Sequence, residues 1–260
     1  TATGDGSSID LMTVAGGSTT LDLDMATINS TIIDTSAADT TAAAIDINVT
    51  GNATLNGVVT LDTFAGQDDA TVIITGTTTL TIANDFTMSV GAATTAAAAG
   101  DITMSANSTI VISGASKTVI ANIEGNATAT TVSITGATTF NGDIGKTTGV
   151  TALTVAADTT LTYGSGSSGA LAITATTVTL NSGSTLTTAS STSSTITGAV
   201  EGSGTLDVNE ATTVVGTIGN TTALTAITVA DAKVLTANST VVKATNITLQ
   251  GATAELNVTG

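Results

Sequence analysis

This chain of 260 residues has no cysteine, proline, histidine, arginine or tryptophan, and only 2% of its residues are aromatic. The absence of cysteine excludes disulfides and thiolate metal sites. Basic residues are almost missing too, since four lysines stand against 20 acidic residues, for a formal charge of −16. Binding to nucleic acid or to an anionic membrane surface requires clustered basic side chains, so the charge argues against both partners.

Long hydrophobic runs are also missing. No stretch of about 20 apolar residues occurs, so we expect no membrane insertion by this segment as a helix. The chain begins TATGDGSS, without a basic and apolar leader. We interpret it as a mature or excised segment of an exported protein, and expect an extracellular or cell-surface location.

Threonine and serine are abundant. The chain has 63 Thr and 22 Ser, about a third of its length, beside 27 Gly, and its apolar residues are mostly Ala, Val, Ile and Leu. A disordered chain would be poor in β-branched residues, whereas this one is rich in them. The composition therefore predicts an all-β fold.

Short runs with apolar residues at every second position recur along the chain and predict strands. Examples are Val132-Ser-Ile134, Leu206-Asp-Val208 and Ile227-Thr-Val229. Many of these runs start 20 or 21 residues apart, as do Leu206, Ile227 and Ile247. No capped helical pattern of any length occurs.

A longer internal repeat connects two parts of the chain. Residues 137–162 align without a gap to residues 211–236, an offset of 74, with 15 identities in 26 positions. Upstream, Ile123-Glu-Gly and Val200-Glu-Gly occupy matching places, which extends the duplicated unit to 123–162 and 200–236.

Short strands in repeats of this length predict a parallel β-helix or β-solenoid of about 20-residue coils, forming one domain over residues 1–260 with the best repeats in 105–260. A narrow interior accommodates Val, Ile, Leu and Ala but little Trp. Proline is excluded because each coil donates backbone N–H groups to the next. Antiparallel β-sandwich domains share the strand count and remain the alternative.

The repeats, such as ATTFNGDIGKTTGVTALTV and ATTVVGTIGNTTALTAITV, resemble the Thr/Gly/Asn-rich β-strand repeats of large bacterial surface proteins. Autotransporter passenger domains, including rickettsial outer-membrane protein B-like antigens, and several surface-layer proteins have similar stretches. The resemblance implies a β-helix or irregular β-solenoid outside a bacterial cell, and it places no catalytic residue on this chain.

Gly145-Lys146-Thr147 looks like the end of a phosphate-binding loop. That motif requires a glycine five residues before Gly145, where this chain has Phe140, and a helix afterwards, where it has a strand-like run. In the second copy Asn220 replaces the lysine. The spacing therefore indicates a solvated turn and not a nucleotide site.

Nothing in the sequence indicates an enzyme. Without His or Cys, a Ser or Thr nucleophile would need a lysine as its base, and no feature distinguishes one of the four lysines. Asp68-Asp69 is the only adjacent acidic pair and reads most simply as a turn. We expect no catalytic residue and no cofactor.

Calcium is the one ligand that the acidic residues suggest, because it takes oxygen ligands from carboxylates and carbonyls. Alternation along Leu21-Asp22-Leu23-Asp24 places both carboxylates on one face of a strand. The candidate calcium ligands are Asp22, Asp24, Asp46 and Asp207.

Threonine pairs such as Thr185-Leu-Thr187 raise the hypothesis of ice binding. That function needs threonines in register over many coils. Because the spacing between the pairs varies, the sequence predicts no such register.

The sequence thus favours a structural protein that self-assembles through its terminal coils into a surface layer or filament, and an adhesin is the alternative. Unpaired strand edges at the ends of a solenoid can add strands from another subunit. The first coil, near residues 9–14, and the last, near 247–258, would carry these contacts. The candidate assembly residues are Ile9, Leu11, Ile247, Leu249, Leu256 and Val258.

Overall fold

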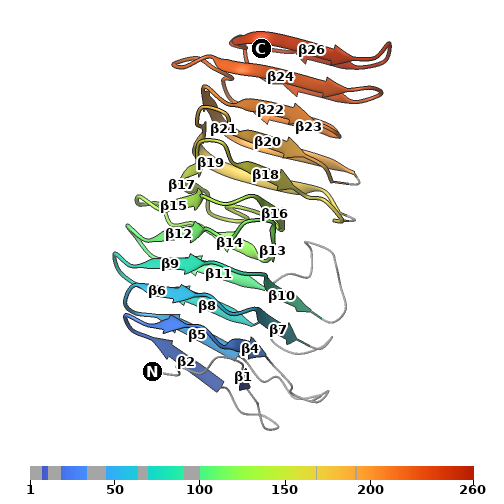
Figure 1. Cartoon of the computed structure of the whole chain (residues 1–260). Helices are drawn as coiled ribbons and strands as arrows, with labels where there is room; N and C mark the ends of the chain where they lie inside the picture. The colour runs from blue at the N-terminus through green and yellow to red at the C-terminus, as the bar shows by residue number, and fades with distance from the viewer. Residues whose placement is uncertain are drawn as a thin grey trace.

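The computed structural model describes residues 8–10, 19–33, 45–63, 70–90, 100–167, 169–190 and 192–260. Within these ranges every regular element is a β-strand, and the paired strands run parallel. The coils stack one on another along a single column from the N-terminus to the C-terminus (Figure 1). Parallel pairing confirms the β-solenoid and rules out the antiparallel sandwich, whose strands would alternate in direction.

The described strands form three sheets on the three faces of the column, and one of these sheets passes from the third face to the second at its long strands. The first face has β1 (Ser8–Asp10), β4 (Thr31–Ile33), β7 (Val59–Thr63), β10 (Phe86–Val90), β13 (Lys117–Ile120), β16 (Thr138–Asn141), β18 (Thr160–Tyr163), β20 (Thr185–Thr188), β22 (Thr205–Val208), β24 (Leu224–Ala230) and β26 (Ala244–Gln250). The second face starts with β2 (Thr19–Leu23), β5 (Ile45–Val49), β8 (Thr71–Ile74), β11 (Asp101–Met104) and β14 (Asn122–Glu124). The remaining sheet starts on the third face with β3 (Thr27–Ile28), β6 (Ala53–Leu55), β9 (Thr79–Ile82), β12 (Thr109–Ile112), β15 (Thr131–Ile134) and β17 (Val150–Val155). It continues with β19 (Leu171–Leu180), β21 (Ser193–Gly202), β23 (Ala211–Val215), β25 (Val234–Ala237) and β27 (Glu255–Val258).

The second face continues beyond β14 through single bridges. Ile144 bridges Ile123 of β14 and Ile173 of β19. The long strands β19 and β21 each extend over two faces, and their pairing shifts between Thr174 and Thr177. The first halves of β19 and β21, followed by β23, β25 and β27, therefore continue the second face. The third face continues from the second half of β21 through Ile218 to Val242.

Coil length varies more than the sequence predicted. Successive turns are spaced about 23 residues apart on average, not about 20. Near the C-terminus, Leu206 pairs with Ile227 and Ile227 with Ile247, as expected, whereas Phe86 pairs with Val119, 33 positions on. The apolar row is kept across this longer coil, since Phe86 pairs with Val59 on one side and with Val119 on the other.

The interior consists of apolar side chains in rows, each residue stacked on its counterpart in the next coil. Along the first face one row includes Leu161, Leu186, Leu206 and Ile227, all fully buried. This stacking follows from the alternation seen in the sequence, since every second residue of a strand points inward.

Two aromatic residues, Phe140 and Tyr163, are paired neighbours in an adjacent row. Phe140 and Tyr163 are fully buried and stack with ring centroids 6.4 Å apart. The Tyr163 hydroxyl donates a hydrogen bond to the Ala172 carbonyl at 2.7 Å. Burial raises the pKa of Tyr163 well above its usual value, and the charges of Asp143 and Glu210 raise it further.

The two copies of the duplicated unit lie on different faces. β16 of the first copy is on the first face, whereas its counterpart β23 is on the second. Likewise β17 is on the third face and its counterpart β24 on the first. From β16 the chain makes three full turns to β22 and then passes to the next face at β23, so the second copy is rotated by one face.

Candidate functional site

The loop after Ile144, which contains Gly145-Lys146-Thr147, binds the side-chain carboxylate of Glu124. The backbone N–H groups of Thr147 and Thr148 donate to the carboxylate of Glu124 at 3.0–3.1 Å. Successive N–H groups converging on one negative group form a backbone nest, the geometry by which other proteins hold phosphate. Here the glutamate of the preceding coil occupies those donors.

The second copy repeats this contact at another corner of the column. The carboxylate of Glu201 accepts hydrogen bonds from the N–H groups of Asn220, Thr221 and Thr222 at 2.9–3.1 Å. Glu124 and Glu201 thus lock two equivalent loops. We name them the clamp glutamates; the matched Ile-Glu-Gly and Val-Glu-Gly segments were the sequence signal for them.

Two glycines make the clamp loops possible. Gly145 and Gly219 have φ angles of 74° and 66°. A Cβ at Gly145 would lie 2.3 Å from the Thr174 carbonyl oxygen, and one at Gly219 would lie 2.1 Å from that of Lys243. Only glycine combines this backbone conformation with such close approach of the next coil.

The side chain of Lys146 takes no part in the nest. Its Nζ lies 3.4 Å from Asp101 Oδ1, and both side chains are more than 30% exposed. Exposed ion pairs of this kind contribute little to stability.

Near this ion pair, burial raises the pKa of Asp143. The hydrogen bond from the N–H of Ala172 and the positive charge of Lys146 partly offset this increase.

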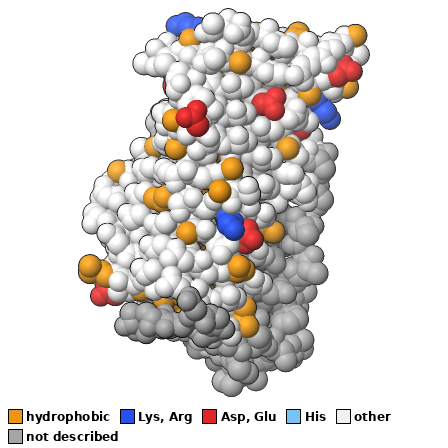
Figure 2. All heavy atoms as spheres, viewed as in Figure 1, with side chains coloured by type: hydrophobic (Ala, Val, Ile, Leu, Met, Phe, Trp, Pro, Cys, Tyr) orange, Lys and Arg blue, Asp and Glu red, His pale blue; other side chains and the backbone are white. Residues whose placement is uncertain are grey.

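The four calcium candidates do not come together. Asp22 on β2 is paired with Asn48 and accepts a hydrogen bond from its amide at 3.0 Å, while Asp46 on β5 accepts one from the Thr71 hydroxyl. Among residues that the structure describes, no group of three or more acidic side chains could hold a metal ion. In Figure 2 the acidic side chains lie singly over the visible face. Calcium binding therefore stays a prediction without a supporting cluster.

The other two candidates, Asp24 and Asp207, have contacts of their own. β2 ends at Leu23, so Asp24 is in the following bend, where a Cβ on Gly51 would meet its Oδ1 at 2.3 Å. Asp207 lies far along the column on β22, and its Oδ2 contacts the Thr187 hydroxyl at 3.4 Å and the Asn209 amide at 3.0 Å.

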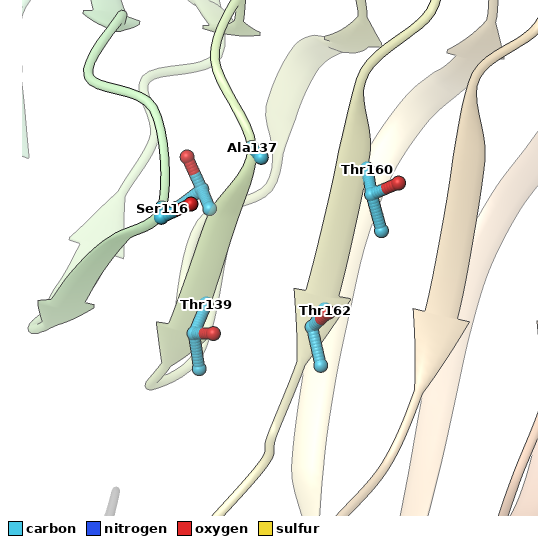
Figure 3. A pocket seen from close by; sticks show the side chains of 6 residues that line it. Ser116, Ala137, Thr139, Thr160 and Thr162 are labelled. Carbon is cyan, nitrogen blue, oxygen red and sulfur yellow. The ribbon is translucent and has the colours of Figure 1, made fainter.

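Threonines on the outer side of the first face are in register, contrary to the expectation from their spacing. The strand pairings align Thr118, Thr139, Thr162 and Thr187 in one column. Thr160, Thr185 and Thr205 form a second column two residues away along the strands. Figure 3 shows Thr139, Thr160 and Thr162 beside a shallow hollow that Ser116 and Ala137 also line. Register survives because the variable residues lie in loops.

The last coil exposes side chains that earlier coils bury. Ile247 and Leu249 of β26 are each 46% exposed, and Val258 of β27 is 52% exposed. Their partners one coil earlier, Ile227, Val229 and Ala237, are fully buried. Ile247, Leu249 and Val258 therefore belong to the same interior rows as these buried partners, but no further described coil covers them.

The remaining assembly candidates are less open. Leu256 of β27 is partly buried against the core, as is Ile9 of β1, which pairs with Ile32. Leu11 lies outside the described residues, as do Asp68 and Asp69.

No described helix is long and apolar enough to cross a membrane. The comparisons with known proteins add no relative, since no family model, no curated protein and no solved structure matches the chain.

Proposed function

We propose that this protein is an extracellular structural protein, a β-solenoid subunit that assembles end to end into a filament or surface layer. The observation that supports the proposal is the exposure of Ile247, Leu249 and Val258, whose counterparts one coil earlier are fully buried. A second copy stacked on this surface would bury the same rows again.

The backbone favours the same contact. β26 and β27 are the end strands of their sheets, so one edge of each has N–H and C=O groups free to pair with an added strand. Strand addition supplies these hydrogen bonds, while the apolar side chains between the two edges supply hydrophobic burial. A head-to-tail contact of this kind does not close on itself and therefore generates a filament.

The proposal predicts that Ile247→Asp disrupts assembly. We expect the wild-type protein to form elongated oligomers whose size grows with concentration, because each contact buries an apolar row. A carboxylate in that row would be buried without a partner in the contact. We therefore expect Ile247→Asp to raise the apparent dissociation constant at least about tenfold. Sedimentation velocity over a concentration series measures this shift.

The control is Thr248→Asp, on the same strand but on its outward side. It adds the same charge and should leave assembly unchanged. A wild-type protein that stays monomeric at high concentration, with and without calcium, contradicts the proposal. Micrographs that show isolated rods instead of fibres or a lattice would favour the adhesin.

A second candidate function is ice binding, which the register of the threonine columns favours. Neighbouring threonines of one column are about 4.8 Å apart, and the two columns are about 6.6 Å apart along the strands. Spacings of this size resemble those between oxygen atoms on faces of hexagonal ice. Hydroxyl and methyl groups repeated at such intervals can hold water in an ice-like arrangement.

If the first face binds ice, Thr162→Lys abolishes most of the thermal hysteresis and the inhibition of ice recrystallisation. A bulky charge in the middle of the columns would break contact with a crystal plane. The matched control is Thr154→Lys on the third face, where Val111 and Glu201 interrupt the equivalent column. Wild-type protein without either activity rules out this candidate.

A further inference from the structure

Four of the buried polar side chains in the described part of the chain lie together as a cluster. Thr188, Ser194, Glu210 and Thr212 are each at most 2% exposed. Thr188 stands in a row between Tyr163 and Val208. On the facing wall, Ser194 and Thr212 are paired neighbours in a row that continues with Leu171 and Leu235. Four adjacent polar side chains thus replace apolar ones deep inside the column.

The hydroxyl protons of this cluster are all engaged. Ser194 donates its proton to Glu210 Oε1. Thr212 donates to the backbone carbonyl of Glu210 at 3.2 Å, so in the 2.8 Å contact between Thr188 and Thr212 the donor is Thr188. No donor is left for Glu210 Oε2, which is buried and has no hydrogen-bond partner. The cluster is therefore rich in lone pairs and short of positive groups.

Its charge is also uncompensated. The chain has four lysines and no arginine. The one ion pair among the described residues joins Lys146 to Asp101, far from Glu210 in the sequence. A carboxylate buried without a counter-charge is strongly unfavourable, and buried charges in proteins are normally paired or bound to a cation.

We propose that Glu210, Ser194 and Thr188 form an internal site for a monovalent cation such as Na⁺. A single carboxylate neutralises a single positive charge, and hydroxyl and carbonyl oxygens complete the ligands. Calcium is a poorer match, because it takes six to eight oxygens and is normally held by several carboxylates. The site is separate from the four predicted calcium ligands and does not depend on assembly.

Thermal unfolding at constant ionic strength tests the site. We compare wild-type protein and Glu210→Gln in sodium, potassium, calcium and choline chloride, since choline is too large to enter. With Na⁺ at ten times its dissociation constant, binding favours the folded state 11-fold, so replacing Na⁺ by choline should lower the wild-type midpoint by about 3 °C. Glu210→Gln should show no difference between the two salts.

Glu255→Gln, which removes an exposed carboxylate on β27, is the charge-matched control and should keep the wild-type response. Sodium NMR relaxation on the wild-type protein gives a second measurement that needs no variant to fold. A wild-type midpoint that is equal in sodium and choline, a response to calcium alone, or a sodium response that persists in Glu210→Gln each overturns the proposal.

Discussion

Replacing Tyr163 with alanine is expected to lower the free energy of unfolding by about 3 to 5 kcal/mol, the usual cost of removing a buried aromatic ring. Tyr163 is fully buried, stacks on Phe140 and lies in register with Thr188 of the next coil. Neighbouring coils are held by continuous backbone pairing, so they cannot close on the cavity. Urea unfolding followed by circular dichroism measures the loss.

Tyr163→Phe is the matched control. It keeps the ring and removes the hydrogen bond to Ala172, whose carbonyl still accepts the N–H of Ile144 at 2.9 Å. We expect Tyr163→Phe to lower the free energy of unfolding by about 1 kcal/mol. Equal stability of Tyr163→Ala and wild type would show that the ring does not support the column.

Removal of a clamp glutamate is the second large effect, and the two copies allow an internal comparison. Glu201→Ala deprives three N–H groups of their acceptor, and we expect it to lower the free energy of unfolding by about 1 to 3 kcal/mol. Glu124→Ala should cost less, because Glu124 is more exposed and accepts from only two residues. Water can reach the freed groups more easily there.

Hydrogen exchange provides the local measurement. In Glu201→Ala the amides of Asn220, Thr221 and Thr222 should exchange faster, while those of Thr147 and Thr148 should not change. Glu201→Gln, which retains one acceptor oxygen but no charge, should lie between alanine and wild type. Unaltered exchange at residues 220–222 in Glu201→Ala would show that the carboxylate does not hold the loop.

Much of this architecture could be predicted from the sequence. Runs such as Val132-Ser-Ile134 and Leu206-Asp-Val208 lie in strands as expected, because period-two alternation is a local property of an extended chain. The second copy of the repeat has Asn220 where the first has Lys146. This difference correctly indicated that the loop geometry does not depend on the lysine, since both loops make the same contact with a glutamate.

Other features depend on which coil lies next to which. Thr139, Thr162 and Thr187 are 23 and 25 positions apart, yet they share one column because hydrogen bonds between strands determine their register. For the same reason the average coil length was underestimated, since loops absorb insertions that spacing alone counts as part of a repeat.

Alternation of apolar and polar residues was enough to establish that this chain is all-β, repetitive and lined inside with small aliphatic side chains, because each of these follows from interactions between near neighbours in the chain. Only the folded column decided that the duplicated units lie on different faces, that the Gly-Lys-Thr loop is closed by Glu124, and that Glu210 is buried beside Ser194. The contacts of Glu124 and Glu210 join residues 23 and 16 positions apart, and their formation depends on how many residues each turn takes to return to the same face.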